Sequence, residues 1–152
     1  MLELKEGCIT AGGRVLVENF SFVAPAGQVT CLVGASGSGK TLLMRSLLGL
    51  WPLDKGYATL DGEPITPNSA SWLRRMMAYV PQQLPESLTD SLEALRQLSV
   101  ESRRVVLIDD PFSSSDITAV CTELRRLAGQ GLAVVVTCSE NIGTSEFKYY
   151  RL

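Results

Sequence analysis

Apolar residues along the chain follow two periods. Runs of four or five mostly apolar residues occur at 29–33, 105–108 and 133–137. Such runs are typical of strands that are buried on both faces of a parallel sheet. Between them, over residues 41–50, 92–98 and 117–128, apolar positions recur every three to five residues, which indicates helices with one buried face. The alternation of the two patterns predicts an α/β fold with a mostly parallel sheet flanked by helices.

The N-terminal part of the chain has a different pattern. Between Leu2 and Phe22, short apolar stretches flank the pair Gly12-Gly13, which predicts an antiparallel hairpin. Further strands are expected at 57–60, 76–80 and 147–152. A chain of this length holds one well-buried core, so we expect a single domain over residues 1–152, with a small antiparallel portion near its N-terminus.

Residues that start or stop helices bound the three helical patterns. Pro52 is expected to end the first helix after Leu50. Asp90, with Glu93 three residues on, has the spacing of a cap for the second helix. Asp116 is expected to cap the third helix. Its buried stripe would consist of Ile117, Val120, Cys121, Leu124 and Leu127.

Charge and composition narrow the class of protein. The formal net charge is −2 and the arginine pairs are scattered, so no strong attraction to nucleic acid is expected. No apolar stretch approaches the roughly 20 residues of a membrane span, and the acidic N-terminus lacks the pattern of a signal peptide. We therefore expect a cytoplasmic protein without direct membrane insertion. Histidine is absent, and the four cysteines form no C-x-x-C pair and are expected to be buried, reduced thiols.

The clearest chemical signal is a phosphate loop. Residues 34–41 match the pattern G-x-x-x-x-G-K-[ST] and lie between a predicted strand and a predicted helix. In this pattern glycines let backbone N–H groups face a phosphate, and the N-terminal end of the helix attracts negative charge. Lys40 would neutralise the outer phosphates, and the Thr41 hydroxyl would ligate Mg²⁺. The predicted binding residues are Gly34, Ala35, Ser36, Gly37, Ser38, Gly39, Lys40 and Thr41.

Several further segments resemble the nucleotide-binding domain of ATP-binding cassette (ABC) proteins. They are Tyr79-Val80-Pro81-Gln82 as the glutamine loop, Val105 to Asp109 as the Walker B motif, and residues 113–116 as the D-loop. The resemblance implies an ABC ATPase-like fold with a P-loop NTPase core, and ATP and Mg²⁺ as ligands. It also implies that Thr41, Gln82 and Asp109 hold the metal, and that Gln82 and Asp110 act on the attacking water.

The middle of the chain departs from the ABC pattern. Only residues 83–104, twenty-two in all, separate Gln82 from the strand at 105–108. An average helix has about 11 to 12 residues, so this space holds one or two helices and not the several-helix subdomain of the family. The Leu-Ser-Gly-Gly-Gln signature of the family is replaced by Leu98-Ser99-Val100-Glu101-Ser102-Arg103-Arg104, which lacks both glycines.

Three single positions also depart from the family. Asp110 stands where the catalytic glutamate is usual and is one methylene shorter; a displacement of ~1 Å can lower a rate about 100-fold. Cys138 stands where a switch histidine contacts the γ-phosphate, and a thiol is a weak hydrogen-bond donor. Near Ala11 the family has an aromatic residue stacked on adenine, and losing such stacking weakens binding by about 1 to 3 kcal/mol.

These observations support one leading hypothesis and two alternatives. The first is Mg-ATP binding by an ABC transporter-like protein, with weak or absent hydrolysis on its own, acting as a subunit or regulator of a transport system. Its partners would be a permease, which would hold it peripherally at the membrane, a signature-bearing ABC ATPase subunit, or a second copy of this chain. A homodimer would lack the second half of both sites. The alternatives are a non-transport interaction module with a vestigial phosphate loop, and a small-molecule kinase with Arg103 and Arg104 as a lid.

Overall fold

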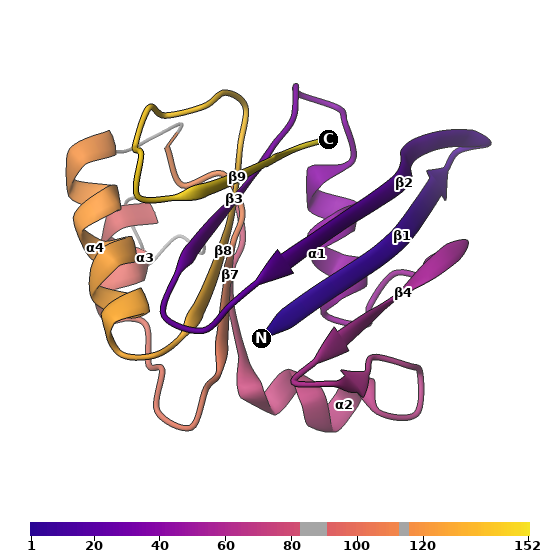
Figure 1. The fold of residues 1–152 in the computed structure, drawn as a ribbon, viewed down its shortest axis with the longest axis horizontal. Helices are drawn as coiled ribbons and strands as arrows, with labels where there is room; N and C mark the ends of the chain where they lie inside the picture. The colour runs from indigo at the N-terminus through magenta and orange to yellow at the C-terminus, as the bar shows by residue number, and fades with distance from the viewer. Residues whose placement is uncertain (83–90, 113–115) are drawn as a thin grey trace.

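The protein is built from two sheets that face each other (Figure 1). The computed structural model describes residues 1–82, 91–112 and 116–152. The parallel sheet has the strand order β6-β7-β8-β3-β9, and the antiparallel sheet has the order β2-β1-β4-β5. This arrangement confirms the predicted α/β fold with its antiparallel N-terminal portion.

The strands and helices have the following bounds. The strands are β1 (Leu2–Ala11), β2 (Arg14–Ala24), β3 (Val29–Val33), β4 (Lys55–Leu60), β5 (Glu63–Pro64), β6 (Met77–Val80), β7 (Val105–Ile108), β8 (Ala133–Cys138) and β9 (Lys148–Arg151). The helices are α1 (Lys40–Leu47), α2 (Ala70–Leu73), the 3-10 turn η1 (Arg74–Met76), α3 (Ser91–Gln97) and α4 (Ile117–Gly129).

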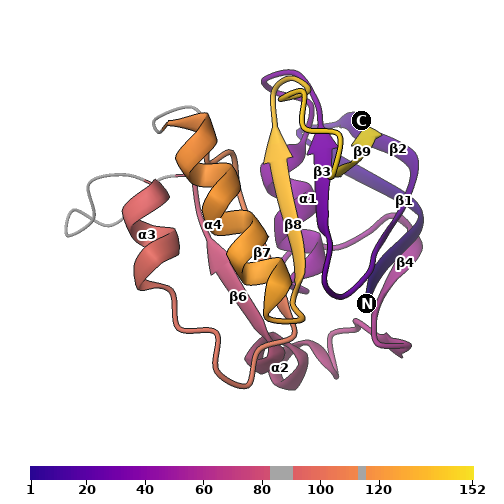
Figure 2. The same ribbon diagram turned by 60° about the vertical axis from the view of Figure 1, so that its left-hand side comes forward.

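The two faces of the parallel sheet bury two apolar clusters. Residues Leu32, Leu107 and Val135 point to the face that is covered by α1 and the antiparallel sheet. Their neighbours Cys31, Val106 and Val134 point to the other face, beneath α3 and α4 (Figure 2). Because both faces are covered, every residue of β3, β7 and β8 is buried, as the apolar runs in the sequence predicted.

Two glycine turns shape the antiparallel sheet. Gly12 and Gly13, with φ of 58° and 76°, connect β1 to β2 in the tight turn that suits a two-residue hairpin loop. Asp61 and Gly62, with φ of 49° and 84°, connect β4 to β5 in the same way. The hairpin predicted around Gly12-Gly13 is thus confirmed.

Helix α1 ends earlier than predicted. The sequence pattern continued to Leu50, but the helix stops at Leu47 and the chain turns at Gly49, whose φ is 75°. Hydrogen bonds from the N–H of Gly49 to the carbonyl of Ser46 (3.0 Å) and from that of Leu50 to Arg45 (2.8 Å) close the helix in a Schellman motif. The left-handed glycine, and not Pro52, therefore ends α1.

The predictions for the later helices were partly correct. The Asp116 carboxylate caps α4 by accepting hydrogen bonds from the N–H groups of Thr118 (2.9 Å) and Ala119 (3.3 Å). Ile117 was wrongly assigned to the buried stripe, since it is 47% exposed at the start of that helix. The predicted cap Asp90 and the D-loop serines 113–115 lie outside the described residues. None of the helices in the described part of the chain is long and apolar enough to cross a membrane.

Candidate functional site

The phosphate-loop segment connects β3 to α1 at the C-terminal edge of the parallel sheet (Figure 2). Gly34 donates its N–H to the carbonyl of Cys138 (3.0 Å), which ties the loop to the end of β8. Gly37 and Gly39 have φ of 80° and 90°, a backbone region that favours glycine. Helix α1 has no side-chain cap and no acidic residue in its first turn. Its first N–H groups are therefore suited to an external anion.

Lys40 lies beneath this loop and is 9% exposed. Its ammonium donates hydrogen bonds to the carbonyl of Gly34 (2.7 Å) and to the Ser139 hydroxyl (3.3 Å). Both hydrogen-bond partners are uncharged. The sequence analysis did not identify Ser139, which directly follows β8.

The acidic pair after β7 is connected to this loop through hydroxyl groups. Thr41 donates to Asp109 Oδ2 (2.7 Å), and Thr137 on β8 donates to Asp109 Oδ1 (2.7 Å). The Asp110 N–H in turn donates to the Thr137 hydroxyl (2.9 Å). Asp109 is buried, with 2% exposure, and both of its oxygens accept a hydrogen bond. The result is a cluster of hard oxygen atoms beside Lys40, the kind of ligand set that Mg²⁺ prefers.

A cavity of about 240 Å³ brings most of the predicted residues together. Gln82, which follows β6, and Asp110 line it together with residues of the loop. Its other lining residues are Leu16, Ser36, Gly37, Gly39, Lys40, Thr41, Leu42 and Ser139. A second cavity of about 420 Å³ continues along α1 and is lined by Thr41, Arg45, Tyr79, Pro81, Gln82 and Asp109. Gln82 therefore lines both cavities, one together with Asp110 and the other together with Asp109.

Comparison with known proteins identifies the family. The sequence model of a family described as ABC transporter matches residues 17–126, well over half of the chain. The chain belongs to the ABC transporter family. It is 37% identical over 82 residues to an uncharacterised ABC transporter ATP-binding protein of Haemophilus influenzae, an alignment covering 54% of this chain and 31% of that protein. It is 36% identical over 76 residues to a manganese transport system ATP-binding protein of Listeria innocua, covering 50% and 30% of the two chains.

Solved ABC structures share the fold across nearly the whole chain. The ATP-binding subunit of an ABC transporter matches with a TM-score of 0.75 at 20% identity, over 99% of this chain and 85% of that one. A dimeric ATP-binding cassette with bound ADP and phosphate matches with a TM-score of 0.73 at 17% identity, over 100% and 94%. In sequence, by contrast, the chain spans about a third or less of the curated relatives it matches.

The residues of this ABC family chain fit phosphate and a hard divalent cation. The Ser38 hydroxyl of the loop is buried and has no hydrogen-bond partner among the described residues. A Cβ placed at Gly37 would meet nothing within 4 Å, which leaves open space above the loop. The Thr41 hydroxyl and the Asp109 carboxylate are hard oxygen groups that a divalent cation could use. Ala35 contributes through its backbone, since its carbonyl accepts the Ser38 N–H (3.1 Å).

Two of the family departures take a specific structural form in this ABC chain. Cys138 is 1% exposed and packs in the cluster beneath α4, so Ser139 and not Cys138 stands at the cavity. Ala11 lies at the tip of the first hairpin, whereas Leu16 of β2 lines the cavity. The described lining of this cavity contains no aromatic residue. The expected thiol burial holds for three cysteines but not for Cys8, which is half-buried.

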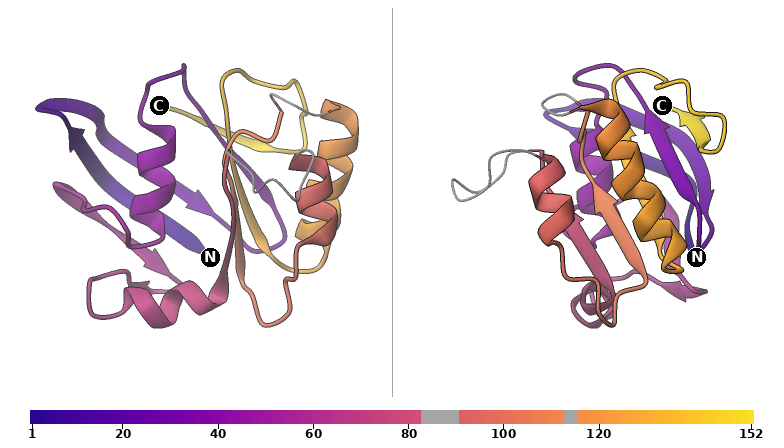
Figure 3. Two further views of the ribbon diagram at one scale, coloured as in Figure 1. Left: turned by 180° about the vertical axis from the view of Figure 1, so that it is seen from behind. Right: turned by 90° about the vertical axis from the view of Figure 1, so that its left-hand side faces the viewer.

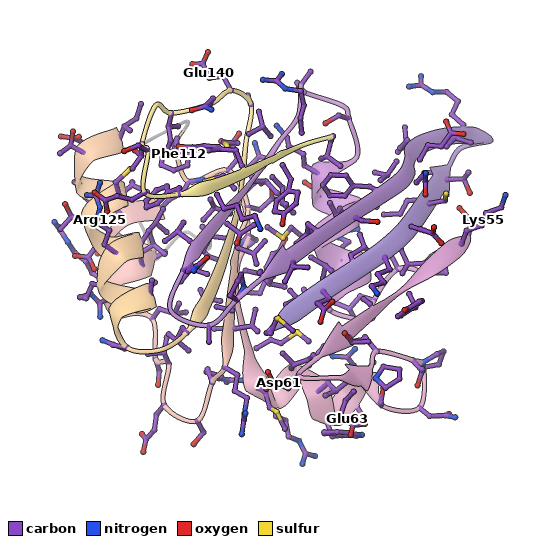
Figure 4. All side chains as sticks on the ribbon, viewed as in Figure 1. Lys55, Asp61, Glu63, Phe112, Arg125 and Glu140 are labelled. Carbon is purple, nitrogen blue, oxygen red and sulfur yellow. The ribbon has the colours of Figure 1, made fainter. Side chains whose placement is uncertain are left out.

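The kinase hypothesis does not fit the position of its two arginines. Arg103 donates to the carbonyls of Arg74, Arg75 and Met77, and so holds the chain at the start of β6. Arg104 forms an ion pair with Asp61 (3.0 Å). Figure 4 shows Asp61 at the edge of the molecule opposite Glu140, the residue that follows Ser139. Both arginines are therefore engaged far from the phosphate loop.

Asp110 occupies an unfavourable environment for a charged carboxylate. Its φ of 45° is uncommon for a residue other than glycine. Burial raises the pKa of Asp110, and Asp109 raises it further, while Lys40 opposes the shift. Because the native state holds the proton more tightly than the unfolded chain, stability falls as the pH rises from the ordinary value of 3.8 through the raised pKa. Above the raised pKa, the ionised Asp110 carboxylate destabilises the fold.

We therefore expect Asp110→Asn to stabilise the protein at pH 7. The substitution removes the charge and keeps the backbone hydrogen bond to Thr137. We expect the melting temperature in EDTA to rise by about 1 °C, a small effect because Asp110 is partly exposed and water screens its charge. The gain should shrink as the pH falls toward 4. The matched control is Glu140→Gln, on an exposed carboxylate at the same edge, which should leave the melting temperature unchanged. A less stable Asp110→Asn variant at pH 7 would contradict this interpretation.

Proposed function

We propose that this chain binds Mg-ATP as an ATP-binding unit of an ABC transport system and hydrolyses it weakly or not at all on its own. The observation that carries the proposal is the convergence of Lys40, Thr41 and Asp109 at the glycine loop. A buried cation, Lys40, and the hydrogen-bonded oxygen atoms of Thr41 and Asp109 lie beside open cavities. Phosphates with a bound divalent cation match this combination of groups.

Each site residue has a role in this proposal. Backbone N–H groups of residues 34–39 and the Lys40 ammonium would hold the phosphates. Mg²⁺ would be held by Thr41, Asp109 and Gln82, and it would neutralise negative charge on the phosphates. Gln82 and Asp110, which both line the cavity, would orient the attacking water. Leu16 would pack against the nucleoside, and an aliphatic side chain there predicts weak selectivity among bases.

Low intrinsic hydrolysis follows from what surrounds this half-site. Residues 98–104 lack the signature glycines and lead from α3 to the start of β7, at the edge opposite the phosphate loop (Figure 2). Two copies of this chain would therefore not supply the second half of each other's sites. A signature-bearing ABC subunit would complete one site, which would still carry the short Asp110 carboxylate and the buried Cys138.

Transport partners are supported by the relatives. Those proteins include the ATP-binding subunit of a manganese transport system and a mitochondrial iron–sulfur cluster transporter of Candida albicans, which is 36% identical over 83 residues, covering 55% of this chain and 11% of that protein. We propose that this chain works with a permease, a second ABC subunit, or both, at the cytoplasmic face of a membrane.

Titration calorimetry of the wild-type chain tests the proposal. Mg-ATP should bind with a dissociation constant in the micromolar range, about −8 kcal/mol, and ATP in EDTA should bind roughly 10-fold more weakly. Phosphate release by the isolated chain should stay near background. Absence of Mg-ATP binding would overturn the proposal and favour an interaction module with a vestigial loop. Rapid phosphate release by the isolated chain would overturn the claim of weak hydrolysis.

A further inference from the structure

The order of strands places one buried hydroxyl between the two acidic residues. Strand β8 lies between β7, which is followed by Asp109 and Asp110, and β3, which leads into the phosphate loop. In the β7–β8 pairing, Ile108 is opposite Val136, so the following residues, Asp109 and Thr137, come side by side. Thr137 has 0% exposure. The Thr137 hydroxyl therefore has no access to bulk water.

Both hydrogen-bonding functions of this hydroxyl are used by the acidic pair. The hydroxyl donates its one hydrogen bond to Asp109 Oδ1 (2.7 Å), and its oxygen accepts a hydrogen bond from the Asp110 N–H (2.9 Å). Thr41 holds the other oxygen of Asp109 from α1 (2.7 Å). The Asp109 carboxylate is thus fixed from both sides, with Oδ2 directed to Thr41.

The same hydroxyl supports an unusual backbone conformation. Asp110 has a φ of 45°, and a residue other than glycine in this region adds strain that neighbouring contacts must hold. The bond from its N–H to Thr137 is such a contact. It fixes the peptide from which the Asp110 side chain extends into the wall of the cavity.

We propose that Thr137 is a positioning residue that couples the magnesium-binding carboxylate of Asp109 to the water-facing carboxylate of Asp110. This inference rests on the proposed function of the site. Groups that orient a metal ligand from behind typically contribute a factor of 10 to 100 to metal affinity. Thr137 orients the Asp109 carboxylate in this way through its hydroxyl hydrogen bond. Through its bond to the Asp110 N–H, it also sets the direction in which the Asp110 side chain extends.

The chain offers a matched control for this role. Thr30 lies on the neighbouring strand β3 and is also 0% exposed. Its hydroxyl is buried and has no hydrogen-bond partner among the described residues. Thr30→Val and Thr137→Val make the same change in volume and polarity within the same sheet. They differ in whether the lost hydroxyl held the acidic pair.

The experiment measures ATP affinity in Mg²⁺ and in EDTA by calorimetry, together with unfolding by urea in EDTA. For Thr137→Val we expect Mg-ATP affinity to fall roughly 10- to 100-fold, and ATP affinity in EDTA to change less than about twofold. Thr137→Ser, which retains the hydroxyl, should remain within about threefold of wild type in Mg²⁺, and Thr30→Val should bind as wild type. Should Thr137→Val not fold, the pair Thr137→Ser and Thr137→Ala decides, because they differ only in the hydroxyl.

Three outcomes would overturn the inference. Equal losses for Thr137→Val in Mg²⁺ and in EDTA would mean that the hydroxyl only stabilises the fold. Unchanged Mg-ATP affinity in Thr137→Val, with wild-type binding intact, would remove the positioning role and leave the proposed function standing. Absence of Mg-ATP binding by the wild-type chain would overturn the proposed function and this inference together.

Discussion

Replacing Lys40 with alanine should weaken Mg-ATP binding by about 10- to 150-fold. Lys40 is 9% exposed, and its ammonium hydrogen-bonds only uncharged partners in the described structure, the Gly34 carbonyl and the Ser139 hydroxyl. A charge-assisted hydrogen bond to phosphate contributes about 1.5 to 3 kcal/mol, and each 1.4 kcal/mol is a factor of 10 in affinity. Removal of a desolvated cation should at the same time leave the free energy of unfolding unchanged or slightly higher.

Calorimetry with Mg-ATP and urea unfolding of the same samples check both parts of this result. Lys55→Ala is the matched control, because Lys55 is an exposed lysine on β4, far from the loop (Figure 4). It should bind Mg-ATP as the wild type does. Binding that survives in Lys40→Ala would show that the phosphates are held elsewhere. Lower stability with no change in ligand binding would indicate a loop that has only a structural role.

Replacing Gly56 with alanine should destabilise the fold by about 3 kcal/mol or more, the sum of strain and overpacking. Gly56 has a φ of 80°, and a Cβ there would lie 2.3 Å from the Lys5 carbonyl oxygen and 2.4 Å from that of Glu6. These oxygens belong to the backbone of β1 and cannot rotate away. Glu6 is itself in the left-handed region, with a φ of 51°. The close approach of β4 to an irregular point of β1 therefore requires glycine (Figure 3).

Urea unfolding compares this variant with Gly62→Ala. Gly62 has nearly the same φ, 84°, but a Cβ there would meet nothing within 4 Å. Gly62→Ala should therefore lower the free energy of unfolding only by the cost of the left-handed backbone conformation, about 1 kcal/mol. A melting temperature lower by roughly 6 to 12 °C is expected for Gly56→Ala, and by about 2 to 4 °C for Gly62→Ala. Equal losses in the two variants would show that the contact with β1 has no energetic consequence.

Much of the fold was predictable where local and tertiary preferences agree. The apolar runs at 29–33 and 105–108 became strands with those bounds, because both faces of the parallel sheet are covered. Asp116 caps α4 as expected, since capping depends on residues only two and three positions away. The predicted end of α1 was wrong because the apolar pattern of the helix continues through the turn that follows it. Gly49 ends the helix, and Arg74 from η1 supports that end by donating to the carbonyl of Leu48 (2.9 Å).

The residues of the site also fall into two groups, those predictable from the sequence and those that only the tertiary structure reveals. The sequence by itself determined the family, the phosphate loop and the acidic pair, because these residues are contiguous and their chemistry depends on local backbone shape. Only the tertiary structure decided that Leu16, Thr137 and Ser139 join them, and that Cys138 does not. A lone threonine at the end of an apolar strand carries no local signal of its partner. Its role arises because strand order places β8 between the acidic pair and the loop, so that hydrogen bonds form between residues far apart in the chain.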